Sequence, residues 1–249
     1  MNKASRVAIV ILAAGEGKRM NSTLPKVLHL IQNKPLVDHV VTAAEKSGVA
    51  DTVVVVVNNK HELVQEYLQN RVKYAVQAEQ RGTGHAVQQT NALLKDRVDT
   101  LIVLYGDMPC IRPESIQRLL QEHKEKKNMM TLMTVTVKDF HESRRPLYSF
   151  SRIIRNSAGA IIKDVQMKDA SEKELQEKEL NTCFFCFDAD WLWKELPLLT
   201  TQNAQQEYYL TDLVARAIET NVAISSVPIS VDEARGINSQ EDLQIITQP

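Results

Sequence analysis

The sequence predicts an α/β fold in which a mostly parallel sheet carries helices on both faces. Short apolar runs rich in Val, Ile and Leu alternate with segments of helical period, and such continuous runs are typical of strands buried on both faces. The 249 residues are 43% hydrophobic, which is enough to build a core. No linker rich in Gly, Pro or Ser interrupts the alternation, so residues 1–249 are predicted to form a single domain.

Each element follows from its local pattern. Apolar runs of strand length predict strands over Val7–Leu12, Thr52–Val57, Lys73–Gln77, Thr100–Tyr105, Met129–Val137, Asn181–Phe187 and Val222–Val227. Amphipathic spacing predicts helices over Pro35–Lys46, Lys60–Leu68, Gly84–Leu94, Pro113–Lys126 and Tyr208–Thr220. Ligands bind such sheets beyond the carboxyl ends of the strands, so the residues that follow the strands are the candidate site residues.

The alternation breaks between residues 138 and 180. The stretch SRIIRNSAGAIIKDV (151–165) predicts a β-hairpin with its turn at Asn156–Gly159. The charged stretch SEKELQEKEL (171–180) predicts an exposed helical segment or a loop. We therefore expect a small hairpin excursion that covers one side of a pocket and is not a separate domain.

Composition excludes several classes of protein. Thirty basic and 31 acidic residues give a net charge of −1, which argues against a protein that binds nucleic acid through bulk charge. The longest apolar runs, at 7–14 and 52–57, are too short for the ~20 residues of a membrane span. Lys3, Arg6 and the first apolar run resemble a signal peptide, but the run leads directly into polar residues, so a buried first strand is the better interpretation.

The three cysteines predict no disulfide framework. Cys110, Cys183 and Cys186 are an odd number, and their use fits a reducing cytosol, so we expect a cytoplasmic protein. CFFC at 183–186 has the spacing of half a zinc site, but no second pair exists. Residues three apart in a strand point to opposite faces, and core cysteines are the simpler interpretation.

The loop after the first strand has the composition of a polyphosphate cradle. The chain has only 8 glycines, where average usage gives roughly 17, and two of them lie in LAAGEGKRM at 12–20. Glycines let backbone N–H groups approach a ligand closely, and Lys18, Arg19 and Lys26 add positive charge. The loop matches neither a Walker A motif nor a complete dinucleotide fingerprint. An ordinary glycine-rich turn with solvated lysines is the alternative.

Two later segments also follow predicted strands. In YGDMP at 105–109, Asp107 comes directly after a buried strand, as a Mg²⁺ ligand should, although Asp-x-Pro is also ordinary turn chemistry. In QAEQRGTGHA at 77–86, glycines precede a helix, and the Gln77 amide suits the edge of a pyrimidine base. His85 has no evident catalytic partner, which favours a capping or packing role.

These segments resemble a known family. LAAGEGKRM…LPKVLH, QAEQRGTGHA, LYGDMP, LNT, EYYLTD and GIN occur in the order found in sugar-1-phosphate nucleotidyltransferases. The match runs from about residue 7 to residue 243 and is most similar to the uridyltransferase half of bacterial enzymes that are both N-acetylglucosamine-1-phosphate uridyltransferases and glucosamine-1-phosphate acetyltransferases. The resemblance implies the nucleotide-diphospho-sugar transferase fold, a Rossmann-like, mixed and mostly parallel sheet with helices on both faces.

The resemblance also implies an activity and a site. The activity is Mg²⁺-dependent transfer of uridylate from UTP to a sugar-1-phosphate, giving UDP-N-acetylglucosamine and pyrophosphate. Arg19, Lys26 and Asp107 would be catalytic, and Asp107 and Asn238 would bind Mg²⁺. The sugar would contact Ser151, Gln166 and Asn181. The nucleotide would be held by Leu12, Ala13, Ala14, Gly15, Lys26, Gln77, Gly82, Thr83, Tyr105 and Gly106.

Three positions on the sugar side depart from the family pattern. SFSRI at 149–153 stands where the family has G-Y-G-R-I, and Asn-Thr-Cys at 181–183 replaces Asn-Thr-Gly. Gln166 replaces a carboxylate that accepts from a sugar hydroxyl. A neutral hydrogen bond contributes about 1 kcal/mol, against about 1.5–3 for a charged one. Uridylyl transfer therefore carries over better than the identity of the sugar. The acetyltransferase half and the trimer that it builds are not carried over.

The sequence is also compatible with other functions. The same chemistry could act on another hexose-1-phosphate. Alternatively, the chain could be a non-catalytic regulatory protein that binds nucleotide sugars, but such a protein would have little need for the two predicted magnesium ligands, Asp107 and Asn238. Guanylyl transfer to a molybdopterin uses a related first loop, but QAEQRGTGHA argues against it. A sugar phosphate with a second pKa near 6 is already an anionic nucleophile at pH 7, so no catalytic Ser, Cys or His is expected. The sequence predicts no oligomeric state.

Overall fold

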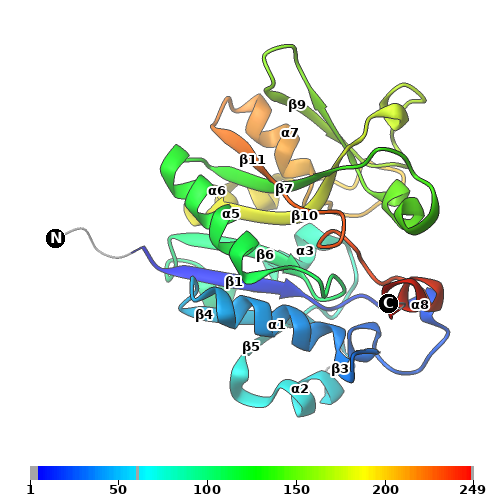
Figure 1. Cartoon of the computed structure of the whole chain (residues 1–249). Coiled ribbons are helices and arrows are strands. Elements are labelled where there is room, and N and C mark those ends of the chain that lie inside the picture. Colours follow the sequence, from blue (N-terminus) through cyan, green and yellow to red (C-terminus); the bar gives the residue numbers. More distant parts are fainter. Residues whose placement is uncertain (1–4, 60–61, 248–249) are drawn as a thin grey trace.

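A computed structural model describes residues 5–59 and 62–247, and Figure 1 shows a twisted sheet between two layers of helices. The main strands run in the order β11-β7-β10-β6-β1-β4-β5. Neighbouring strands pair in parallel except β10, which is antiparallel to both β6 and β7. The predicted mixed, mostly parallel α/β fold is confirmed. The main strands are β1 Val7–Leu12, β4 Thr52–Val57, β5 Lys73–Val76, β6 Thr100–Tyr105, β7 Met130–Thr136, β10 Glu179–Asp188 and β11 Ile224–Pro228.

Strand β1 is buried along its whole length. Side chains alternate between the faces of a strand, so Ile9 and Ile11 enter one core cluster while Ala8 and Val10 enter the other. The parallel pairing with β6 brings Leu12 opposite Tyr105. Because both strands end at the same edge, the loops that follow them meet there.

Helices cover both faces of the sheet, as the sequence predicts. In Figure 1, α1 and α5 lie in front of the sheet and α3, α6 and α7 lie behind it. The helices are α1 Leu36–Ser47, α2 Glu62–Leu68, α3 Thr83–Gln88, α4 Asn91–Leu94, α5 Pro113–Lys126, α6 Ala189–Glu195, α7 Asp212–Glu219 and α8 Gln240–Thr247. Shorter elements are the strands β2 Leu30–Ile31 and β3 Lys34–Pro35, and the 3₁₀ helices η1 Lys18–Met20, η2 Lys26–Leu28, η3 Gln69–Arg71, η4 Glu142–Ser149, η5 Glu174–Gln176 and η6 Leu196–Leu198.

Two predicted helices are wrong in extent. The helix predicted over Gly84–Leu94 is broken into α3 and α4 at Thr90, whose hydroxyl donates to the Val87 carbonyl and so competes with the helical ladder. The helix predicted over Tyr208–Thr220 begins at Asp212 instead. Tyr208, the first residue of the predicted helix, instead forms backbone hydrogen bonds with Arg81 and Gly84. Backbone groups that are already paired in this way cannot form the first helical turn.

The bounds of β1, β4, β6 and α5 are those predicted, and the other predicted ends differ by at most two residues, within the usual uncertainty of helix and strand ends. Of the helix predicted over Lys60–Leu68, residues 60–61 lie outside the described residues, and α2 is described from Glu62. Helices α6 and α8 were not predicted from the sequence. Helix α8 packs beside the first loop, where the Gln240 amide donates to the Met20 carbonyl at 3.2 Å.

The hairpin is confirmed as β8 Arg152–Arg155 and β9 Ile161–Val165. The Asn156 side chain accepts from the backbone N–H groups of the turn, and Gly159 has a φ of 82° that favours glycine. The hairpin continues the main sheet, because β8 pairs with β10. The charged stretch at 171–180 forms one 3₁₀ turn and then the start of β10.

The cysteine and membrane predictions can be compared with the structure. The three thiols are free, and Cys186 is fully buried while Cys183 is only partly buried. Residues 5–59 and 62–247 contain no cluster of three or more His, Cys, Asp or Glu suited to a metal ion. No helix among them is long and apolar enough to cross a membrane. The apolar run that resembles a signal peptide is the buried strand β1, and Lys3 lies outside the described residues.

The central strands should carry most of the stability. Ile102 in β6 is fully buried, whereas Ile162 in β9 is 47% exposed. We expect Ile102→Ala to lower the free energy of unfolding by about 2–5 kcal/mol, because it leaves a cavity in the core. The matched Ile162→Ala should change it by about 0.5 kcal/mol. Urea denaturation measures both, and similar losses for the two variants would contradict this core arrangement.

Candidate functional site

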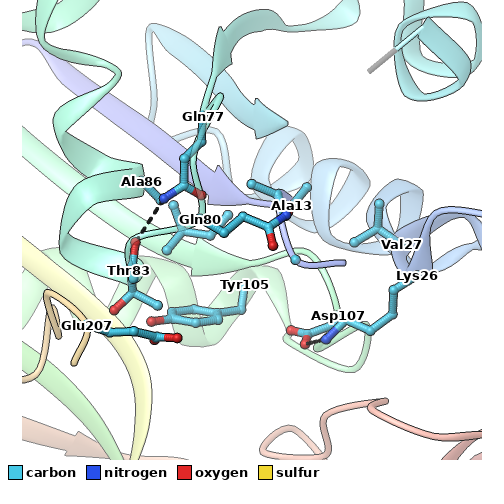
Figure 2. A pocket seen from close by; sticks show the side chains of 14 residues that line it. Ala13, Lys26, Val27, Gln77, Gln80, Thr83, Ala86, Tyr105, Asp107 and Glu207 are labelled. Carbon is cyan, nitrogen blue, oxygen red and sulfur yellow. Dashed lines mark hydrogen bonds and ion pairs between the residues drawn. The ribbon is translucent and has the colours of Figure 1, made fainter. Parts of the chain in front are cut away.

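A cavity of about 260 Å³ lies at the carboxyl ends of β1 and β6 (Figure 2). It brings together all the residues predicted to hold the nucleotide except Gly106. Its position is the one expected for a ligand site in a parallel sheet. The lining residues are Leu12, Ala13, Ala14, Gly15, Lys26, Val27, Gln77, Gln80, Gly82, Thr83, Ala86, Tyr105, Asp107 and Glu207.

The first loop is held from its outer side. The Ala13 N–H donates to the Val56 carbonyl at 2.8 Å, and the Ala14 carbonyl accepts from the amides of Asn58 at 3.2 Å and Gln80 at 2.6 Å. The N–H groups of Ala14 and Gly15 donate to none of the described residues, so they can bind an anion. Sequence reasoning missed Asn58 and Gln80, although both are amides that follow strand ends.

Gly106 has a structural role behind this loop. Its N–H donates to the Leu12 carbonyl at 2.9 Å. An added Cβ would lie 3.2 Å from that carbonyl oxygen and 3.3 Å from the Ala13 side chain. Glycine therefore allows the end of β6 to approach the end of β1 closely.

One lysine joins the two predicted metal ligands. Lys26 Nζ forms an ion pair with Asp107 Oδ2 and donates to Asn238 Oδ1 at 3.1 Å. The side chains of the ion pair are only 12% and 16% exposed. The Asn238 N–H donates to Asp242 Oδ2 at 2.8 Å, which holds the end of this segment. Two oxygens thus converge on one positive charge.

This donor set fits a magnesium ion. Mg²⁺ prefers oxygen ligands and usually takes one or two protein oxygens, with phosphate and water in its other positions. Asp107 and Asn238 supply a carboxylate and an amide oxygen that reach the same cation. The pair is too small for a dedicated protein cage and is suited to a metal that arrives with phosphates.

At the far end of the cavity, Gln77 is 4% exposed. Its Nε2 donates to the Gly82 carbonyl at 3.0 Å and contacts His85 Nδ1 at 3.1 Å. Burial, and then the nearby Arg81 charge, lower the pKa of His85, so the neutral ring accepts at Nδ1. The packing role predicted for His85 thus includes orienting Gln77. The Gln77 oxygen accepts from none of the described residues and is left for a ligand.

The segment around Gly82 is clamped by residues 207–211. Tyr208 donates its N–H to the Arg81 carbonyl and accepts from the Gly84 N–H, both at 2.8 Å. Thr83 Oγ1 accepts from the Leu210 N–H at 2.9 Å. These bonds explain why two motifs distant in the sequence lie against each other, and they fix the wall of the cavity.

Tyr105 forms the floor of the cavity. Figure 2 shows its ring with Thr83 and Glu207 at one end and the pair of Asp107 and Lys26 at the other. Burial raises the pKa of the Tyr105 phenol well above its ordinary value, so the hydroxyl stays neutral. The floor is therefore an uncharged surface between the two ends.

The three predicted sugar ligands do not line the cavity. Ser151 and Asn181 are buried next to each other, since the Asn181 N–H donates to the Ser151 carbonyl at 3.1 Å. The Asn181 amide donates to Asp164 Oδ2 at 2.6 Å and accepts from the Cys183 N–H at 2.7 Å. The Gln166 amide donates to Thr211 Oγ1 at 2.7 Å. The Asn181 and Gln166 side chains are thus bonded to other protein groups outside the cavity.

Arg19 also lies away from the cavity. It is exposed and lines a neighbouring hollow of about 580 Å³, together with Asn238 and Arg145. Of the three residues predicted to be catalytic, Lys26 and Asp107 meet in the structure, whereas Arg19 lines the second hollow, which also includes Asn238.

Sequence reasoning missed Asp164. Burial, and to a lesser degree the Asp212 charge, raise the pKa of its carboxyl to about 7, although hydrogen bonds from the Ser151 and Asn181 side chains act to lower it. Its Oδ2 accepts from the Asn181 amide at 2.6 Å, and the Ser151 hydroxyl lies beside the same carboxyl. The only signal in the sequence is a single acidic residue in the otherwise strand-like IIKDV at 161–165.

Comparison with known proteins agrees with this geometry. The model of the MobA-like NTP transferase domain matches residues 9–178. The chain belongs to this nucleotidyltransferase family. A solved CMP:2-keto-3-deoxy-manno-octonic acid synthetase complexed with CTP has the same fold, with a TM-score of 0.70 at 17% identity, over 98% of this chain and 97% of that one.

Curated relatives are similar along nearly the whole chain. The bifunctional protein GlmU of Latilactobacillus sakei is 41% identical over 96% of this chain and 50% of its own length. Those of Streptococcus mutans and Clostridium botulinum (strain Loch Maree) are 40% and 39% identical, over 93% and 94% of this chain and 49% and 50% of their own lengths. The chain thus spans about half the length of these relatives.

The contact between Gly82 and Tyr208 should be essential to the site. Gly82 has a φ of 108°, and an added Cβ would lie 2.6 Å from Tyr208 O and 2.7 Å from Tyr208 N. Gly159 also has a positive φ, but nothing lies within 4 Å of its Cβ position. Gly82→Ala should therefore cost about 1–3 kcal/mol more stability than Gly159→Ala and should weaken nucleotide binding. Equal losses in thermal denaturation would show that the contact does not matter.

The Asp164 carboxyl should make stability depend on pH. Its folded-state pKa of about 7 lies above the ordinary value of 3.8, so the folded form holds the proton more tightly. The free energy of unfolding should fall as pH rises from about 4 to about 7. Asp164→Asn removes this loss, so the variant should gain stability relative to the wild type across that range. Urea midpoints at several pH values test this, with Asp190→Asn, at an exposed position of α6, as control. A difference that does not change with pH would contradict it.

Proposed function

We propose that this chain is a Mg²⁺-dependent uridylyltransferase that joins UTP to a sugar-1-phosphate, foremost N-acetylglucosamine-1-phosphate, and releases pyrophosphate. The single observation that carries the proposal is one cavity with the Gln77 amide at one end and, at the other, the Lys26–Asp107 ion pair, which Asn238 also contacts. The similarity to bifunctional GlmU proteins supports the same activity. Their other half has no counterpart in the match, so the proposal concerns nucleotidyl transfer alone.

The amide end is complementary to uracil. Both Nε2 hydrogens of Gln77 are engaged by the Gly82 carbonyl and His85, which leaves the Gln77 oxygen as an acceptor. The Gly82 N–H donates to none of the described residues. Uracil offers an N3–H donor flanked by two carbonyl acceptors, so it can satisfy both groups. Cytosine N3 carries no hydrogen and would face the Gln77 oxygen with a second acceptor.

The chain's own groups suit phosphoryl transfer. The N–H groups of Ala14 and Gly15 and the Lys26 ammonium would bind the triphosphate and align its α-phosphorus. Asp107 and Asn238 would hold Mg²⁺, which when bound neutralises charge that builds on the phosphate oxygens. An oxygen of the sugar phosphate forms a bond to the α-phosphorus, and the bond from that phosphorus to the β-bridging oxygen breaks. Pyrophosphate leaves with the electron pair of that bond.

No protein base is required. A sugar-1-phosphate with a second pKa near 6 is largely dianionic at pH 7, and its oxygen attacks without losing a proton. The barrier is mainly that of gathering two polyanions, which fixed donors and cations lower electrostatically. Because Lys26 and the loop N–H groups would supply this electrostatic stabilisation, the proposed reaction needs no nucleophilic side chain.

The sugar end gives a reason to consider other hexose-1-phosphates. Ser151 and Cys183 stand where the related pattern has glycines, and Gln166 stands where it has a carboxylate. The Cys183 backbone has a φ of 63°, a conformation that favours glycine. A cysteine side chain therefore occupies a position whose backbone conformation suits glycine better. These substitutions would change contacts with the sugar, whereas the residues proposed to hold the nucleotide keep the related pattern.

Pyrophosphate release tests the function. The assay combines the purified chain, UTP and Mg²⁺ with a panel of sugar-1-phosphates that includes N-acetylglucosamine, glucose and galactose forms. Release with one sugar, abolished by EDTA and restored by excess Mg²⁺, is the expected result. Release with glucose-1-phosphate alone would refute only the choice of sugar. Tight UDP-sugar binding without release for any sugar would favour a non-catalytic regulatory protein instead.

Asp107 should be needed for turnover and not for folding. Asp107→Asn keeps the shape of the side chain but removes the charge that faces Lys26. We expect turnover to fall by about 10²–10³ or more, since a single electrostatic contact of this kind is worth about 2.7–4 kcal/mol. Circular dichroism should be unchanged, and Asp190→Asn on the surface should keep full activity. Wild-type turnover in Asp107→Asn would refute the metal assignment.

A further inference from the structure

The second hollow lies on the other side of the proposed metal ligands. It has a volume of about 580 Å³, and its lining residue Asn238 accepts from Lys26, which lines the nucleotide cavity. Arg19 and Arg145 line it from the 3₁₀ helices η1 and η4, which are far apart in the sequence. None of the residues proposed to contact uracil or the sugar lines this hollow. Binding of the base or of the sugar therefore does not explain it.

The two arginines of this hollow lack acidic partners. Arg19 and Arg145 are exposed, and neither forms an ion pair at 4 Å or less with any residue that the structure describes. The neighbouring Arg144, by contrast, is paired with Asp139 at 2.7 Å. Guanidinium groups match the geometry of phosphate oxygens and bind them through paired hydrogen bonds. Two unpaired guanidinium groups on one hollow therefore favour a phosphate-bearing ligand.

A buried positive charge lies behind the wall of the hollow. Phe140 and Tyr148 line the hollow, and the Arg152 guanidinium carbon lies 4.9 Å and 5.0 Å from the centres of their rings. Arg152 is fully buried, and none of the described carboxylates pairs with it at 4 Å or less. Lys178 Nζ lies 4.4 Å from the centre of the Phe140 ring. Because solvent screens a buried charge less than an exposed one, this side of the hollow attracts anions.

The segment that carries Arg145 is held in place from both ends. At its start, Arg144 donates to Asp139 Oδ1 through Nε at 2.9 Å and through Nη2 at 2.7 Å. Near its end, Arg152 donates to the Tyr148 carbonyl at 3.0 Å. A segment that is ordered before a ligand arrives loses less entropy on binding. The protein therefore presents Arg145 to the hollow on a preformed support.

Three acidic residues also line the hollow. Glu142 and Glu241 are exposed, and the Asp242 carboxylate accepts from the Asn238 N–H at 2.8 Å. Mg²⁺ bound to phosphates usually keeps several water molecules, and carboxylates can accept hydrogen bonds from such water. A lining of arginines and carboxylates therefore suits the magnesium complex of a polyphosphate better than a bare anion.

We propose that this hollow receives the departing pyrophosphate as its magnesium complex, and that Arg145 binds it together with Arg19. This inference rests on the proposed function. The α-phosphate would lie at Lys26, whose Nζ contacts both Asp107 in the cavity and Asn238 in the hollow. Because the β- and γ-phosphates continue from the α-phosphate, they would extend past Lys26 towards the hollow. Arg145 is thus a pyrophosphate-binding residue that comes from outside the first loop.

The first test is isothermal titration of the purified chain with magnesium pyrophosphate. We expect Arg145→Gln to raise the Kd by about tenfold or more, as for loss of a hydrogen bond to a charged group. Arg145→Lys should raise it less, because it keeps the charge and loses only the fork. Arg97→Gln, at an exposed position before β6 and at the opposite end of that strand from Asp107, should bind like the wild type. An unchanged Kd in Arg145→Gln would overturn the role of Arg145.

Steady-state kinetics distinguish pyrophosphate from the phosphate of the sugar. In the reverse reaction, Arg145→Gln should raise the KM for pyrophosphate by about tenfold or more. The KM values for the UDP-sugar and, in the forward reaction, for the sugar-1-phosphate should stay within about twofold. A higher KM for the sugar-1-phosphate without a change for pyrophosphate would overturn the assignment of the hollow. No turnover by the wild type with any sugar would overturn the proposed function, while the titration would still test Arg145.

Discussion

The site depends on one ammonium group shared by three distant parts of the chain. Lys26 follows the first strand, Asp107 follows β6 and Asn238 precedes α8, and the Lys26 Nζ contacts oxygens of both other residues. This contact requires β1 and β6 to be parallel neighbours that end together, as the pairing of Leu12 with Tyr105 shows. The same arrangement sets the first loop beside Tyr105 and creates the cavity between them.

The two ends of the cavity differ in kind. The nucleotide end is built from backbone groups and from Gln77, each fixed by bonds that other residues provide, such as those from Tyr208 to the segment around Gly82. The residues proposed to contact the sugar lie beside the hairpin: Ser151 precedes β8, Gln166 follows β9 and Asn181 is in β10. Because the hairpin joins the main sheet through β10, its residues can change without disturbing β1 and β6. If these residues contact the sugar as proposed, substrate choice can vary while the scaffold for nucleotidyl transfer stays the same.

Much of the fold follows from local patterns. The Val, Ile and Leu runs identify the buried strands, because a strand covered on both faces must be apolar throughout. The residues after those strands include most of the cavity lining for the same reason. The late start of α7 could not be predicted, because it depends on bonds between Tyr208 and the segment around Gly82, more than a hundred residues away. Asp164 was missed because its burial and its bond to Asn181 arise only when the hairpin packs on β10.

We expect the cavity to bind uridine nucleotides through an acceptor at Gln77 and a donor at Gly82. Isothermal titration of the chain with UTP and with CTP, each with Mg²⁺, tests it most directly. UTP should bind at least about tenfold more tightly, because cytosine N3 would place an acceptor against the Gln77 oxygen and leave both unpaired. Equal or tighter binding of CTP would contradict this account of the site.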